Sequence, residues 1–346
     1  MAGVRFDVVG IGNAIVDVIA TADEAFLAAH GMTKGAMMLV DEARATAIYE
    51  AMGATVTTSG GSAGNTIAGL ASFGAHAAYI GKVRDDVFGR AFRHDITALG
   101  VHFPTPPAVG GAATACCLIV VTPDSERTMN TYLGACVTLG PDDVDQALVR
   151  DAQVVYLEGY LYDEPLAKQA FARSAQIAHG AGRRVALTLS DPFCVERHRA
   201  DFLNFIEGHV DILFANEREA AMLFENGDRA RWYARLRAMT QLAIVTYSAA
   251  GSVIVAPNEE IEIAAARVGP VVDTTGAGDL YAAGFLYGLT RNAPLRTCGQ
   301  LGSLAAAEVI SHFGARPQRS LRELAAQQVS AANQSVDELG LGNGGF

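Results

Sequence analysis

The chain has 346 residues, of which 50% are hydrophobic and 18% charged, so it is expected to bury a large core. Its formal net charge of −11 argues against binding a nucleic-acid backbone, which needs a basic face. Five cysteines without a CxxC pair argue against a zinc ribbon and a disulfide framework. The N-terminus lacks the order of a secretory signal, and no apolar run is long enough for a membrane span. We therefore expect a cytoplasmic protein with no membrane partner.

Apolar runs of strand length alternate with helical patterns through most of the chain. The predicted strands lie at 6–11, 77–80, 154–157, 185–189, 210–214, 243–247 and 253–256. The predicted helices lie at 62–73, 86–99, 163–181, 195–207 and 217–225, and the chain from Gly276 to residue 334 is expected to contain helices only. Continuous apolar strands separated by helices predict an α/β fold with a central, mostly parallel sheet flanked by helices.

Two segments interrupt this alternation with short β-rich runs at 15–20, 37–40, 115–121 and 128–133. Strands that come from separate parts of an α/β chain predict a small β-sheet, which would act as a lid over the crevice at the ends of the main strands. The predicted division is a core of residues 1–13, 41–107 and 138–335, a lid of residues 14–40 and 108–137, and a loose tail of residues 336–346.

The sharpest signal for chemistry is the run D-T-T-G-A-G-D at 273–279, which precedes a helical pattern. Its glycines allow close approach to the backbone, and the free amides at a helix start bind anions. Asp279 stands in the first turn of that helix. Amides that hold a phosphoryl group beside a carboxylate that accepts a hydroxyl proton suit phosphoryl transfer to an alcohol. The alternative is a turn with an Asp that merely favours the helix N-terminus.

Two further runs predict a substrate site. In S-G-G-S-A-G-N at 59–65, glycines let a ligand touch the main chain and Asn65 offers a donor and an acceptor; the alternative is a tight turn capped by Ser62. The run V-G-I-G-N-A-I-V-D at 9–17 opens like a dinucleotide fingerprint, but Ile15 occupies the third glycine position. Asn13 and Asp17 suit vicinal hydroxyls instead, unless Asp17 only closes a turn. The chain has no P-loop motif.

Three motifs, in order, resemble those of the ribokinase-like (PfkB-type) carbohydrate and nucleoside kinases. They are Gly-Gly-x-x-x-Asn at 60–65, Asn-Glu-Arg-Glu at 216–219 and D-T-T-G-A-G-D at 273–279, and the resemblance covers about residues 6–317. Within this family, the stretches 127–135, 156–160, 189–193 and 210–217 are most similar to the adenosine kinases. Three positions depart from that branch or from the family: Met37, where the eukaryotic adenosine kinases carry a polar residue; Thr275, where they carry Asn; and Ser248, where the family carries Gly.

The resemblance implies a ribokinase-like fold and an ATP-dependent kinase that phosphorylates the 5′-hydroxyl of a nucleoside, with adenosine as the expected substrate and AMP and ADP as products. It implies that Asp279 is the base and that the amides of Gly276, Ala277, Gly278 and Asp279 form the anion hole. The substrate hydroxyls would be held by Asn13, Asp17, Gly61 and Asn65. Arg127 lies in the lid where adenosine kinases place a cation toward the transferring phosphate, unless it is a solvated arginine of the hairpin.

The nucleotide side follows from the same resemblance. Asn216 and Glu219 would serve the ATP phosphates and Mg²⁺, with Glu219 acting through water, while Thr246 and Gly251 would line the nucleotide loop beside Gly276 and Gly278. Main-chain oxygens of Asp273 and Thr275 would hold a monovalent cation such as K⁺.

The number of apolar residues near the site helps to distinguish a nucleoside substrate from a sugar. A purine needs an apolar slot, which Met37, Leu39, Met129, Leu133 and Tyr160 would supply, and Tyr160 and Phe193 would stack on the base unless they pack in the core. The alternatives are a sugar kinase acting on ribose, fructose or a related sugar, and an inactive protein that senses a sugar or nucleoside. The retained Asp279 and both glycines weigh against the sensor.

We expect ATP and a small-molecule substrate as partners, and a monomer or a homodimer formed through the lid.

Overall fold

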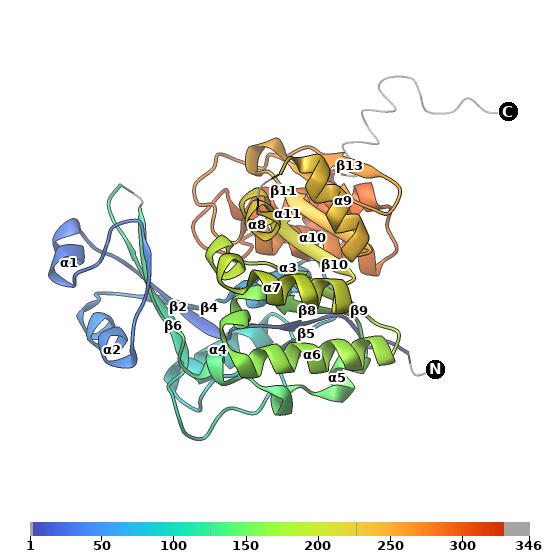
Figure 1. Cartoon of the computed structure of the whole chain (residues 1–346). Helices are drawn as coiled ribbons and strands as arrows, with labels where there is room; N and C mark the ends of the chain where they lie inside the picture. The colour runs from blue at the N-terminus through green and yellow to red at the C-terminus, as the bar shows by residue number, and fades with distance from the viewer. Residues whose placement is uncertain (1–2, 125, 226, 329–346) are drawn as a thin grey trace.

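The computed structural model of the chain describes residues 3–124, 126–225 and 227–328. These residues form a large α/β body with a smaller β-sheet that projects from one side (Figure 1). The large sheet has the strand order β13-β12-β11-β10-β9-β8-β1-β5. Its pairings are parallel from β5 to β11, and β12 and β13 join antiparallel at the other edge. The predicted fold class, a mostly parallel sheet with a small second sheet, is confirmed.

The strands of the large sheet are β1 (Phe6–Ile11), β5 (Ala77–Ile80), β8 (Ala152–Glu158), β9 (Arg184–Thr188), β10 (Ile212–Asn216), β11 (Leu242–Thr246), β12 (Ser252–Val255) and β13 (Glu260–Ile263). Neighbouring residues of one strand enter different cores, as in β1, where Val8 packs on one face and Val9 on the other. The first face is covered by α3 (Ser62–Ser72), α4 (Val87–Ala98), α10 (Ala277–Thr290) and α11 (Leu295–Val309). The second face is covered by α5 (Gln146–Arg150), α6 (Pro165–Gly180), α7 (Pro192–His209), α8 (Glu217–Phe224) and α9 (Arg229–Met239).

The small sheet has the order β3-β7-β6-β2-β4, formed by β2 (Ile15–Thr21), β3 (Met37–Leu39), β4 (Val56–Ser59), β6 (Ala115–Val121) and β7 (Arg127–Tyr132). The helices α1 (Glu24–Ala29) and α2 (Glu42–Ala51) lie beside it in Figure 1. The sequence division assigned residues 41–107 to the core, whereas β4, within that range, pairs antiparallel with β2. This pairing extends the small sheet, because the chain returns along β2 before it enters α3.

The chain after Gly276, which was expected to contain helices only, also contains a loop. Helix α11 ends at Val309, and residues 310–320 form a loop before the chain becomes helical again at Leu321. Gly314, with φ +94°, and Pro317 explain the interruption, because neither residue suits a helix interior. The predicted tail at 336–346 lies outside the described residues. Within the described part of the chain, no helix is long and apolar enough to cross a membrane.

Candidate active site

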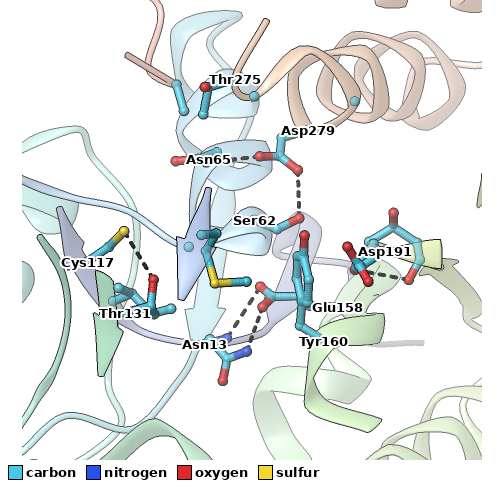
Figure 2. Close-up of a pocket in the computed structure, with 18 of the residues that line it drawn as sticks. Asn13, Ser62, Asn65, Cys117, Thr131, Glu158, Tyr160, Asp191, Thr275 and Asp279 are labelled. Carbon is cyan, nitrogen blue, oxygen red and sulfur yellow. Dashed lines mark hydrogen bonds between the residues drawn. The ribbon is translucent and has the colours of Figure 1, made fainter. Parts of the chain in front are cut away.

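A cavity of about 750 Å³ lies between the small sheet and the strand ends of the large one. It brings together residues that the sequence places far apart (Figure 2). The predicted site residues that line it are Asn13, Asp17, Met37, Leu39, Gly61, Asn65, Met129, Leu133, Tyr160, Phe193, Asn216, Glu219, Thr246, Thr275, Gly276, Ala277, Gly278 and Asp279. Three predicted residues, Arg127, Gly251 and Asp273, are not part of its lining.

The start of α10 forms one wall of the cavity. Gly276 is the N-cap and has φ +79°, and a Cβ there would lie 2.8 Å from the Cβ of Ala315, so this position requires glycine. Within the described chain, the backbone amides of Gly276, Gly278 and Asp279 donate to no protein acceptor, whereas the amide of Ala277, also predicted for the anion hole, donates to the carbonyl oxygen of Thr274 at 3.2 Å. At Gly278, in contrast, a Cβ would meet nothing within 4 Å. Free amides at the positive end of a helix form a site for an anion.

The Asp279 carboxylate lies beside these amides and is held by α3. Ser62 Oγ donates to Asp279 Oδ1 at 2.6 Å, and Asn65 Nδ2 donates to Asp279 Oδ2 at 2.9 Å (Figure 2). Burial raises the pKa of Asp279, while the two hydrogen bonds and the charge of Arg316 oppose that increase. Ser62 therefore does not cap its own helix, as the alternative for this run supposed: the N-cap is Gly61.

The Gly61 turn packs against the end of β1. Gly61 has φ +84°, and a Cβ there would clash with the carbonyl oxygen of Asn13. Both segments are held by Glu158 at the end of β8. Its Oε1 accepts from Asn13 Nδ2 at 2.8 Å, and its Oε2 accepts from the backbone amide of Ala63 at 2.7 Å. Burial raises the pKa of Glu158 to about 7, against the lowering effect of these donors.

Asp17 lies in the middle of β2, opposite Thr58 of β4 and Cys117 of β6, so it does not close a turn. Within the described chain, its carboxylate accepts no hydrogen bond from a protein group, although it lines the cavity. Burial raises the pKa of Asp17 to about 6, and the positive charges of Arg316 and Arg127 limit the increase. A carboxylate without a protein donor is suited to accept hydrogen bonds from a hydroxylated ligand.

Arg127, at the start of β7, forms an ion pair with Asp273 rather than pointing into the cavity, and both side chains are largely buried. The Asp273 carboxylate also accepts from the hydroxyl of Thr275 at 2.7 Å and from the amide of Gly314 at 3.1 Å. The alternative that Arg127 is a solvated arginine is therefore wrong, and Arg127 also does not line the cavity, in which the resemblance places it. Its pairing with Asp273 ties the small sheet to the loop that precedes α10.

On the nucleotide side, Asn216 and Glu219 form a reciprocal cap at the start of α8. Asn216 Oδ1 accepts from the amide of Glu219 at 2.9 Å, and Glu219 Oε1 accepts from Asn216 Nδ2 at 2.6 Å. Burial raises the pKa of Glu219 to about 7. Among the described residues, no cluster of three or more His, Cys, Asp or Glu side chains could hold a metal directly. The oxygen donors of Glu219 and Asp191 that line the cavity suit Mg²⁺ bound through water and substrate phosphates.

The loop after β11, which the resemblance predicts to be the nucleotide loop, contains Ser248, which has φ +50° at the position where the family carries glycine. Gly251, with φ +89°, closes this loop, and its amide donates to the Ser248 carbonyl at 3.1 Å. Gly251 therefore shapes the backbone beside Thr246 without lining the cavity itself.

Apolar side chains form the part of the cavity under the small sheet. Met37 and Leu39 of β3 are 51% and 60% exposed, and Tyr160 and Phe193, which line the same cavity from the large α/β body, are 40% and 67% exposed. Met129 and Leu133 lie beside them. The expectation that Tyr160 and Phe193 are ordinary core aromatics is wrong, because a core residue would not be exposed to this extent.

Sequence reasoning missed three residues that organise the site: Ser62 as a partner of Asp279, Glu158, and Arg316. Glu158 gave a usable signal, because it is a charged residue directly after the continuous apolar strand Val154–Leu157. Arg316 gave none, because its partners lie more than 250 residues away in the sequence, at separations of 252 and 257.

Comparisons with known proteins agree with this geometry. The model of the pfkB family of carbohydrate kinases matches residues 8–321. An adenosine kinase from Sinorhizobium meliloti is 52% identical, with a TM-score of 0.86 over 94% of this chain and 99% of that chain. A probable sugar kinase from Rhizobium etli is 50% identical, with a TM-score of 0.87 over 94% of this chain and 99% of that one. An adenosine kinase from Saccharomyces cerevisiae is 27% identical over 328 residues, which are 88% of this chain and 94% of the yeast protein.

Kinases of this family use ATP, generally with Mg²⁺, and transfer a phosphoryl group to an alcohol of a sugar or nucleoside. The matched range includes the three motifs found in the sequence and all the residues that line the cavity. The chain therefore belongs to the pfkB family of carbohydrate kinases.

Proposed function

We propose that this phosphotransferase is an ATP-dependent nucleoside kinase that phosphorylates the 5′-hydroxyl of adenosine. The observation that carries the proposal is the composition of the single cavity described above. Asp279 and the free amides of α10 form one wall, and apolar side chains of the small sheet face Tyr160 and Phe193 at another. The first wall suits phosphoryl transfer, and the second suits a flat apolar ring.

The transfer step uses Asp279 as the general base. The ionised carboxylate accepts the proton of the 5′-hydroxyl, and the hydroxyl oxygen forms the new bond to the γ-phosphorus while the bond to the leaving ADP oxygen breaks. The amides of Gly276, Gly278 and Asp279 stabilise the charge on the transferring group. Ser62 and Asn65 keep the carboxylate oriented through the hydrogen bonds described above.

The ribose is held by groups whose hydrogen-bonding capacity is unused in the protein. The Asp17 carboxylate has no protein donor among the described residues, and the side-chain oxygens of Asn13 and Asn65 are also unpartnered. Vicinal hydroxyls donate to such acceptors, while the Gly61 backbone allows close approach of the ring. Glu158 keeps Asn13 in place.

The nucleotide enters from the side of α8 and β11. Asn216, Glu219 and Thr246 would line the path of the ATP phosphates, and Glu219 would hold Mg²⁺ through water. The ion would neutralise charge on the phosphates during transfer. The carbonyl oxygens of Asp273 and Thr275 would hold a monovalent cation such as K⁺, which would support the loop that carries the anion hole.

The apolar wall supports a purine over a bare sugar, and the similarity to the Sinorhizobium protein, which is named an adenosine kinase, supports the same choice. The second candidate is a sugar kinase that acts on ribose or fructose. Two observations favour it: Thr275 is the residue that sugar kinases carry before the first glycine of the loop, and the Rhizobium relative is named a probable sugar kinase.

A panel of nucleosides and sugars, assayed by coupled ADP release, tests the proposal. Adenosine should be the best acceptor, and the product should be AMP. Turnover of ribose or fructose with no turnover of adenosine would move the protein to the second candidate. No turnover of any acceptor, in a protein that still binds adenosine, would indicate the inactive sensor.

A further inference from the structure

The loop after α11 is fixed by a buried carboxylate. Glu308, in the last turn of α11, is completely buried, and its Oε1 accepts from the backbone amides of Gln318 and Arg319, each at 3.0 Å. His312 Nε2 lies 3.2 Å from the same oxygen. The loop between Glu308 and Gln318 therefore has a defined position, and it carries Ala315 and Arg316 toward the cavity.

Arg316 holds the glycine turn between β4 and α3 at both of its ends. Its Nε donates to the carbonyl oxygen of Ser59 and its Nη2 to Ser59 Oγ, each at 2.9 Å. Its Nη1 donates to the carbonyl oxygen of Gly64, also at 2.9 Å. Ser59 is also held from the opposite side by Asp95, which accepts from the Ser59 amide at 2.7 Å and from its hydroxyl.

The same loop also contacts the segment that precedes α10. Ala315 lines the cavity and packs against Gly276, where a Cβ would come within 2.8 Å of the Ala315 side chain. Ala315 therefore contacts the anion-hole loop, and Arg316, the next residue, contacts the turn that carries Ser62 and precedes Asn65. These are the segments whose relative position determines the hydrogen bonds from Ser62 and Asn65 to Asp279.

The charge of Arg316 acts on the same groups. It lowers the pKa of Asp17 and of Asp279 against the effect of burial. The other ionisable groups that interact with Asp279 are Asp17 of β2, Tyr156 and Glu158 of β8, Tyr160, and Glu219 of α8. Arg127 of β7 acts on Asp17 from the small sheet. Arg316 is thus a positive charge that acts on both Asp17 and Asp279.

We propose that Arg316 is a positioning residue for phosphoryl transfer, which clamps the 59–64 turn against the start of α10 so that Asp279 stays oriented toward the acceptor hydroxyl. The kinetic part of this inference rests on the proposed kinase function, but its structural part does not. Arg316 forms no hydrogen bond with Asp279, so it positions that carboxylate through Ser59 and Gly64. A guanidinium suits this task because its rigid fork reaches all three acceptors at once.

The test compares Arg316→Met, which removes the charge and the fork, with Arg316→Lys, which keeps only the charge. The matched control is Arg322→Met, because Arg322 is exposed and lies against Gly74, beyond the far end of α3. Backbone hydrogen exchange of residues 59–65 is measured by mass spectrometry without ligands. The pH profile of kcat/KM is measured with the best acceptor of the panel.

Arg316→Met should exchange faster at residues 59–65 and should lose about 10- to 100-fold in kcat/KM, because a displacement of ~1 Å at a reacting group costs about 10²-fold. The acid limb of the kcat/KM profile of Arg316→Met should move to higher pH, since removal of a positive charge raises the pKa of a nearby carboxylate such as that of Asp279. Arg316→Lys should keep the wild-type acid limb and a reduced kcat, and it replaces Arg316→Met as the test if the latter does not fold. Arg322→Met should match the wild type.

Wild-type exchange at residues 59–65 together with a wild-type pH profile in Arg316→Met would overturn the inference. Equal changes in Arg316→Met and Arg322→Met would also overturn it, since they would show a general loss of stability. If the wild type phosphorylates no acceptor, the proposed function fails, and the exchange comparison alone still decides whether Arg316 clamps the turn.

Discussion

At the scale of single residues, Asp279 is the group on which the proposed chemistry depends most. Its carboxylate accepts from two donors, so Asp279→Asn keeps the size of the side chain, removes the proton acceptor and leaves one oxygen to accept in place of two. We expect kcat to fall by about 10²–10⁴-fold, the usual loss for a positioned general base, with ATP and adenosine binding largely intact. Steady-state kinetics and calorimetric binding check this. A kcat within a few-fold of the wild type would exclude Asp279 as the base.

The two glycines of the anion hole should respond differently to substitution. A Cβ at Gly278 meets nothing within 4 Å, so Gly278→Val should fold while its side chain obstructs the phosphoryl site. Gly276 has φ +79° and no room beside Ala315, so Gly276→Ala should lower the melting temperature as well. Thermal unfolding and turnover of both variants separate the two effects. A folded Gly278→Val with normal turnover would be incompatible with the proposed anion hole.

Asp17 should give the enzyme a pH-dependent preference for ribose over deoxyribose. The pKa of Asp17 is raised to about 6, so the side chain is ionised above that pH and becomes protonated as the pH falls through it. The ionised form accepts hydrogen bonds from hydroxyls that contribute about 1.5–3 kcal/mol each. The ratio of kcat/KM for adenosine to that for 2′-deoxyadenosine should therefore fall below about pH 6.

This ratio cancels the titration of Asp279, which affects both substrates equally. Asp17→Ala provides the control: its ratio should be lower than that of the wild type and independent of pH. Equal losses for the two substrates in Asp17→Ala, or a constant ratio in the wild type between pH values on both sides of about 6, would show that Asp17 does not bind the ribose hydroxyls.

At the scale of elements, we expect the small sheet to determine the proposed preference for a base. If the sheet covers on the order of 100 Å² of a purine, burial contributes about 2.5 kcal/mol at ~25 cal/mol per Å². That corresponds to a preference of about 70-fold over a bare sugar. Met129→Asp, on β7, should remove most of this margin between adenosine and ribose. Val56→Asp on β4 is the control, because Val56 is 68% exposed and is not part of the cavity lining. A margin unchanged in Met129→Asp would show that the sheet does not contact the base.

Much of the element structure could be predicted, because it depends on local patterns. The strands at 6–11 and 77–80 match β1 and β5, and α3 and α8 end within one residue of their predictions. The place of β4 in the small sheet could not be predicted, because its antiparallel pairing with β2 depends on contacts that no local pattern records. Helix α9, in which four arginines interrupt the apolar residues, and strand β13, which has only four residues, were also missed.

The site was predictable to the extent that it consists of motifs. The glycine runs and Asp279 are contiguous in sequence, and the cavity contains most of the residues proposed from them. Glu158 and Arg316 are single charged residues whose partners are Asn13, Ala63, Ser59 and Gly64, at sequence separations between 95 and 257. Their positions follow from the completed fold and not from any local spacing.

At the scale of the whole molecule, two bodies meet over one cavity and are joined by buried polar contacts. The ion pair between Arg127 and Asp273 connects the small sheet to the loop before α10, and Arg316 connects the C-terminal loop to the glycine turn. The nucleotide side and the substrate side therefore share the start of α10, where Asp279 lies. The proposed reaction places the acceptor hydroxyl at that point whether the acceptor is a nucleoside or a sugar, so the acceptor itself has to be measured.

The most direct measurement is a competition between equimolar adenosine and ribose for limiting ATP, with AMP and ribose phosphate quantified by mass spectrometry. The product ratio equals the ratio of the two kcat/KM values. The apolar wall formed by Met37, Leu39, Met129 and Leu133 predicts AMP in at least about tenfold excess, because burial of a purine is worth more than that factor. Ribose phosphate in an amount equal to or greater than AMP would contradict the account and would identify the protein as a sugar kinase.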